Sequence, residues 1–113
     1  MNKAKIQTLL GFAMKSGKLS LGENAVLETI KFGKAKIVFI ASDASQNTSK
    51  RLLDKSNYRH IPVCMDLDRY ELGKAIGREY CMSIALKDKN FALGIKKEMG
   101  GNAIEEKEDI CNS

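Results

Sequence analysis

The chain has 113 residues and a mass of 12.5 kDa, which is the length of one domain. A hydrophobic share of 43% and a charged share of 29% are usual for a globular protein, and they exclude a disordered chain, a collagen-like fibre and a disulfide-stapled miniprotein. The net charge of +5 favours polyanionic partners, so nucleic acid is the first partner to consider and a membrane surface the second.

A helix, a short strand and a second helix are predicted first along the chain. Apolar residues spaced by three and four predict a helix over residues 3–15, and Gly17 suits its end. Alternating leucines predict a short strand at Leu19–Leu21. A second helix opens at Gly22-Glu23-Asn24 and runs to Lys31 or the residue after it.

The strongest strand signal lies at residues 36–41. Its unbroken apolar run predicts burial on both faces, as in the centre of a sheet that helices cover. Pro62, the single proline, suits an edge strand or the first residues of a strand. Helices and strands continue to alternate after residue 41: a helix capped by Ser45 through about Asn57, a strand at 61–65, a helix at 69–76, a strand at 81–86 and a helix at 90–99.

This alternation with short connections predicts an α/β fold, a three-layer α/β/α sandwich around a small mixed four-stranded sheet. Residues 1–100 are expected to form one domain, followed by an acidic, flexible tail at residues 101–113. Four acidic residues lie in that tail, so residues 1–100 carry 18 basic and 10 acidic side chains. The domain itself is therefore more basic than the whole chain.

The sequence contains no motif typical of a catalytic site, a metal site or a membrane-spanning helix. His60 is the single histidine and no CxxC pair exists, so a zinc site is not expected. Cys64 and Cys81 lie in apolar strands and are interpreted as core thiols, although pairing of either with His60 in a small hydrolase is an alternative. We expect no catalytic residue, no cofactor, no metal and no small-molecule substrate. The longest apolar run, Ile37–Ala41, is far shorter than a membrane span of about 18 residues, so we expect no membrane partner and a cytoplasmic monomer.

The start of the second helix is the best candidate binding site. A helix N-terminus offers unpaired N–H groups and partial positive charge to a phosphate or a base edge. Gly22, Glu23 and Asn24 form this start, and the Asn24 amide can both donate and accept a hydrogen bond. A capping or first-turn role for Asn24 and a merely solvated role for the lysines are equally open. The nearby basic candidates are Lys18, Lys31, Lys34 and Lys36.

Residues 22–43 resemble the signature of the kink-turn RNA-binding ribosomal protein family, which includes the large-subunit proteins seven-Ae and thirty-e. The shared pattern is Gly-x-Asn, a helix ending in Gly-x-Ala-Lys, and an apolar strand ending in Ala-x-Asp. Residues 71–77 resemble the second signature, Leu-Gly-x-Ala-x-Gly. Residues 43–48 and 88–92 are similar to the bacterial subgroup called YlxQ. The resemblance extends over residues 3–99.

The resemblance implies a fold that binds a sharply bent RNA helix, with ribosomal or other structured RNA as partner and the ribosome as a further candidate. It implies that Asn24 contacts a guanine beside sheared G·A pairs and that Gly22 allows the backbone to approach. The loop Arg78-Glu79-Tyr80-Cys81 would pack near a flipped-out nucleotide, where Tyr80 can stack on a base.

Two residues depart from the family pattern. Ala25 stands where kink-turn binders have glutamate, and Glu28 stands where they have lysine. Each change is expected to weaken the usual contact by about 1–3 kcal/mol. The hypothesis is therefore a non-enzymatic, ribosome-associated RNA-binding protein, and the alternative is a protein–protein interaction module with the same fold.

Overall fold

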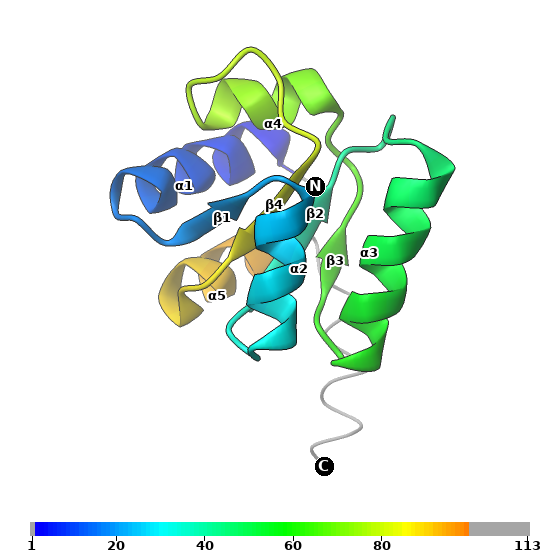
Figure 1. Cartoon of the computed structure of the whole chain (residues 1–113). Coiled ribbons are helices and arrows are strands. Elements are labelled where there is room, and N and C mark those ends of the chain that lie inside the picture. Colours follow the sequence, from blue (N-terminus) through cyan, green and yellow to red (C-terminus); the bar gives the residue numbers. More distant parts are fainter. Residues whose placement is uncertain (1, 100–113) are drawn as a thin grey trace.

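The computed structural model describes residues 2–99, which fold into alternating helices and strands as expected (Figure 1). The predicted acidic tail at residues 101–113 lies outside the described residues. In chain order the elements are α1 (Lys3–Lys15), β1 (Leu19–Leu21), α2 (Glu23–Lys31), β2 (Ile37–Ile40), α3 (Gln46–Tyr58), β3 (Val63–Cys64), α4 (Arg69–Ala75), β4 (Ser83–Leu86) and α5 (Lys89–Glu98).

The strands form one mixed sheet in the order β1-β4-β2-β3. The pairs β1–β4 and β2–β4 are antiparallel, whereas β2 and β3 are parallel. Helices α1, α4 and α5 cover one face of this sheet, and α2 and α3 cover the other (Figure 1). The three-layer α/β/α prediction is confirmed.

Strand β2 holds the two halves of the core together. Ile37 and Phe39 pack against α1, α4 and α5, while Val38 and Ile40 pack against α2 and α3. All four side chains are 0% exposed. The unbroken apolar run therefore does signal a strand covered on both faces, as predicted.

Several element ends differ from the prediction by one or two residues, and two differences have a clear cause. Strand β3 pairs with β2 only at Val63 and Cys64, because the preceding Pro62 has no N–H group to add to the ladder. Its carbonyl still accepts a hydrogen bond from the Val38 N–H at 3.0 Å, and the strand lies at the sheet edge that suits a proline. Strand β4 begins at Ser83 because the Cys81 N–H bonds to the Arg69 carbonyl of α4 at 2.9 Å.

The loop after β2 is fixed to the start of α4 by Asp43 and Arg69. The Asp43 carboxylate accepts hydrogen bonds from the Arg69 backbone N–H and from its Nε, both at 3.0 Å. Desolvation alone would raise the pKa of the Asp43 carboxyl, but the hydrogen bonds and charge of Arg69 outweigh it and lower that pKa. The ionised form is therefore favoured in the folded state.

Asp43→Asn is expected to lower the stability of the protein at neutral pH and to make that stability less dependent on pH in the acid range. A lowered folded pKa makes a contribution that is complete above the unfolded pKa of about 3.9 and is lost as the pH falls through the folded value. Urea unfolding midpoints of wild type and variant should therefore converge toward low pH. Asp54→Asn, at an exposed position of α3, is the control, and an equal pH response of the two variants would contradict this role.

Candidate nucleic-acid interface

The start of α2 is a partly exposed helix N-terminus without a side-chain cap. Its N-cap is Gly22, whose φ of 90° and ψ of 158° belong to a region open almost only to glycine. The Gly22 N–H donates to the Ser83 carbonyl at 3.1 Å, which fixes the turn against β4. Because Gly22 has no side chain, the first-turn N–H groups receive no acceptor from the cap and remain open to a ligand.

Asn24 is the second residue of α2, and its side chain is exposed. The cap is Gly22, so Asn24 occupies the first turn rather than the capping position. Its amide forms no hydrogen bond with any residue between 2 and 99. The neighbouring Glu23 differs, because its carboxylate forms an ion pair with Arg51 of α3. Of these two side chains, Asn24 therefore has the free hydrogen-bonding groups.

The loop before β4 is held tightly against α4. The Arg78 N–H donates to the Gly73 carbonyl at 2.8 Å, and the side chains of Arg78 and Tyr80 are exposed. Cys81, at the end of the loop, packs against the Gly22 turn, and burial raises the pKa of its thiol. The core interpretation of Cys81 is confirmed, and the loop lies at the same end of the sheet as the start of α2.

The structure thus brings Gly22, Asn24, Arg78 and Tyr80 to one end of the sheet, named here the Asn24 end. Gly22 joins β1 to α2, and Asn24 lies in the first turn of α2, whereas Arg78 and Tyr80 belong to the loop between α4 and β4. The register of β1 and β4, with Leu21 opposite Ile84, places these segments together. This end combines open N–H groups, an amide, a guanidinium and an aromatic ring.

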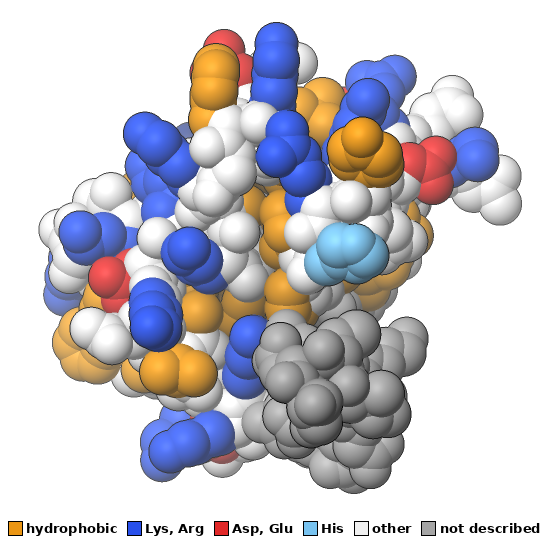
Figure 2. Space-filling view, turned by 90° about the horizontal axis from the view of Figure 1, so that it is seen from below, with side chains coloured by type: hydrophobic (Ala, Val, Ile, Leu, Met, Phe, Trp, Pro, Cys, Tyr) orange, Lys and Arg blue, Asp and Glu red, His pale blue; other side chains and the backbone are white. Residues whose placement is uncertain are grey.

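The predicted lysines lie at the opposite end of the sheet, named here the lysine end. The Lys87 N–H donates to the Lys18 carbonyl at 2.9 Å, and the Lys36 N–H donates to the Leu86 carbonyl at 2.7 Å. Lys34 follows the end of α2, which at 1.5 Å per residue is about 10 Å from Asn24. Figure 2 looks onto this end and shows Lys and Arg side chains spread over much of it. Lys87 is a member that the sequence analysis missed.

A groove between α2 and α3, named here the α2–α3 groove, joins the two ends. It has a volume of about 450 Å³. Two of the predicted residues, Asn24 and Lys31, line it. Its α3 side was not predicted, although residues 51, 55 and 59 are basic and spaced by four, which places them on one helix face. The residues that line the groove are Asn24, Leu27, Glu28, Ile30, Lys31, Lys55, Tyr58 and Arg59.

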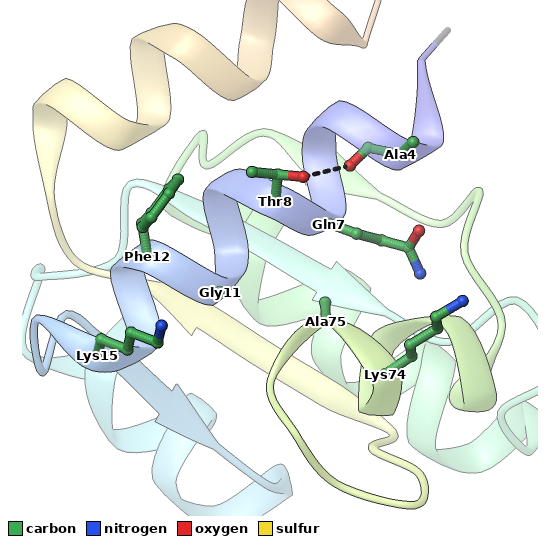
Figure 3. Close-up of a pocket in the computed structure, with 8 residues that line it drawn as sticks. All are labelled: Ala4, Gln7, Thr8, Gly11, Phe12, Lys15, Lys74 and Ala75. Atoms are coloured by element: carbon green, nitrogen blue, oxygen red, sulfur yellow. Dashed lines mark hydrogen bonds between the residues drawn. The ribbon is translucent and has the colours of Figure 1, made fainter.

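Another hollow lies between α1 and α4 on the other side of the sheet (Figure 3). Its volume is about 390 Å³, and none of the predicted site residues lines it. Gly11 allows the two helices to approach, since a Cβ atom there would lie 3.1 Å from the Ala75 carbonyl oxygen. This hollow is a helix-packing feature. Within residues 2–99 no cluster of three metal-ligating side chains is present and no helix is long and apolar enough to cross a bilayer.

Comparison with known proteins gives the family. A profile of the Ribosomal protein L7Ae/L30e/S12e/Gadd45 family matches residues 4–96. The chain belongs to this family. It is 40% identical over 100 residues to the RNA-binding protein YlxQ of Enterococcus faecium, an alignment that covers 88% of this chain and 96% of the relative. It is 39% identical over 84 residues to the RNA-binding protein YlxQ of Bacillus subtilis strain 168, covering 74% of this chain and 84% of the relative.

A solved structure agrees with these sequence relatives. A protein of unknown function from Bacillus halodurans C has a TM-score of 0.80 and 36% identity, covering 83% of this chain and 95% of that one. In this L7Ae/L30e-family chain both signature stretches border the Asn24 end. The first contains Gly22, Asn24 and Asp43, and the second contains Gly73, against which the Tyr80 loop packs. The resemblance drawn from these motifs is confirmed.

Proposed function

We propose that this chain is a non-enzymatic RNA-binding protein that associates with ribosomal or other structured RNA in the cytoplasm. The Asn24 end contacts the bases and backbone of a bent RNA, and the lysine end adds attraction to phosphates. The relatives at about 40% identity are named as RNA-binding proteins, which supports RNA rather than the protein–protein alternative.

The observation that carries the proposal is the state of Asn24. A side-chain amide at a helix N-terminus, exposed and without a hydrogen bond among the described residues, keeps its donor and acceptor available. The open N–H groups of the first turn lie beside it and favour anions. Base-edge hydrogen bonds and phosphate contacts can therefore be made at one place.

The separation of the two ends indicates different roles for them. Lys34 and Lys36 lie away from Asn24, so we assign them to phosphate attraction without base discrimination. Two residues differ from the family pattern in this region: Ala25 lies in the first turn of α2, at the Asn24 end, and Glu28 lines the adjoining α2–α3 groove. They favour a weaker requirement for the kink-turn geometry than in typical members of the family.

The proposal is tested by titrating RNA-free protein with a structured RNA at several salt concentrations. Lys34→Gln with Lys36→Gln is expected to weaken binding to all RNAs alike and to reduce the slope of log K against log salt by roughly one to two units. Lys5→Gln with Lys97→Gln removes the same charge from exposed positions of α1 and α5 and should change the slope less. Wild-type protein that binds no RNA at low salt would contradict the proposed function.

A further inference from the structure

The α2–α3 groove is a built surface with both ends defined. At one end the Glu23 carboxylate pairs with Arg51, and at the other Arg59 donates to the Lys31 carbonyl at 2.8 Å. Glu23 and Lys31 are eight positions apart on α2, and their partners Arg51 and Arg59 are eight positions apart on α3 and its C-cap. The two helices therefore run side by side in the same direction for about 12 Å. The α2–α3 groove lies between these two contacts and begins at Asn24.

The lining of the groove has the chemistry of a surface for an unpaired nucleic-acid strand. Tyr58 is 81% exposed, so its ring offers a face for stacking on a base. Leu27 and Ile30 give the groove an apolar floor. The cations Lys31, Lys55 and Arg59 outnumber the single carboxylate of the lining, Glu28, by three to one.

Contacts within the fold do not explain why Lys31, Lys55 and Tyr58 occupy this surface. Lys55 forms no ion pair with any residue between 2 and 99, and neither does Lys31, whose ammonium nitrogen lies 5.9 Å from the centre of the Phe32 ring. An aromatic ring as exposed as Tyr58 contributes little to the core. Phosphates are a natural partner for the free ammonium groups, and a base is a natural partner for the ring.

We infer that the α2–α3 groove binds an unpaired RNA strand that continues from the nucleotides held at Asn24 toward the lysine end. The inference rests on the proposed function, because Asn24 belongs both to the base-contacting end and to the groove. It adds that the protein distinguishes an RNA with a single-stranded extension from the same RNA without one.

The test compares one bent RNA with versions that carry an unpaired extension at either end. Wild type is expected to bind at least one extended RNA about tenfold more tightly, the gain typical of one stacked base with added phosphate contacts. Tyr58→Ala with Lys55→Gln should abolish this gain and leave binding of the unextended RNA nearly unchanged. Arg59 is left intact because it also bonds to the end of α2.

The matched control is Tyr70→Ala with Lys50→Gln. Tyr70 is 61% exposed on α4 and Lys50 is exposed on α3, and neither lines the groove. This control should keep the full gain from the extension. Thermal unfolding of all variants confirms that each is folded before titration.

The outcomes separate the two proposals. Wild type that binds the bent RNA but gains nothing from an extension at either end overturns the groove inference and leaves the proposed function standing. The same holds if the groove variant keeps the gain or if the control loses it equally. Wild type that binds none of the RNAs overturns the proposed function, and the groove inference with it.

Discussion

Gly73→Ala is expected to destabilise the fold by about 1–3 kcal/mol, the range for overpacking a dense interior. A Cβ atom on Gly73 would lie 2.5 Å from the Tyr80 Cα, 2.6 Å from its N and 2.9 Å from the Arg78 carbonyl oxygen. These obstacles are backbone atoms of a loop that also hydrogen-bonds to α4, so they cannot move aside by a side-chain rotation. The loop must shift or the helix must tilt, and urea unfolding measures the cost.

Gly94→Ala is the control that gives the opposite sign. Gly94 also lies inside a helix, α5, but the nearest atom to its Cβ would be the Leu9 Cδ1 at an ordinary 3.5 Å. Alanine there should stabilise the protein by about 0.5–1 kcal/mol, because glycine is a poor helix former. Equal changes in the free energy of unfolding for the two substitutions would show that the close packing of the Tyr80 loop does not depend on glycine at position 73.

Asn24→Ala is expected to weaken binding of a bent, G·A-containing RNA by about 1–3 kcal/mol and binding of a plain duplex of equal length by almost nothing. The amide offers a paired donor and acceptor to a base edge, whereas phosphate attraction does not depend on the base. Since Asn24 is exposed and unbonded among the described residues, its removal should not change stability. Titration of both RNAs at one salt concentration measures the difference.

Asn90→Ala is the matched control for this substitution. Asn90 is likewise the exposed second residue of a helix, α5, which belongs to the layer on the other face of the sheet. It should affect neither RNA. Equal losses for Asn24→Ala on bent RNA and duplex would remove base recognition from this position.

The double change Ala25→Glu and Glu28→Lys is expected to tighten binding of the bent RNA. It adds an acceptor for guanine N–H groups in the first turn of α2, and it replaces a negative charge on the exposed surface of the helix by a positive one. The duplex should respond to the charge alone. If the bent RNA gains no more than the duplex, the kink-turn mechanism does not operate here.

The fold could be predicted from the sequence because its signals are local. The unbroken run of β2, the serine before α3 and the glycines after α1 and α2 each determine an element from neighbouring residues alone. Strand β3 was predicted too long because the apolar pattern of residues 61–65 does not reveal how few of them pair. Pro62 limits the pairing on the N-terminal side, but where the pairing ends after Cys64 depends on the parallel strand β2, which is not a local property.

The candidate site could be predicted only in part, since it depends on the register of the strands. Asn24 and the lysines near it in sequence suggested one surface, but the length of α2 separates them. Lys18 and Lys36 meet because β1 and β2 both pair with Leu86 of β4. To predict the groove one must know that α3 runs beside α2. The four-residue spacing of the basic residues of α3 places them on one face of that helix, but it does not show which element packs beside that face.

The short edge strands limit how this protein can associate. Strand β1 has three residues and β3 has two, and Pro62 removes a further donor beside β3. An incoming chain that tries to extend the sheet would find too few free N–H and C=O groups to form a stable ladder. Self-association into fibrils and recognition of extended peptides by strand addition are therefore both disfavoured. The protein can be concentrated on an RNA surface without its sheets joining edge to edge.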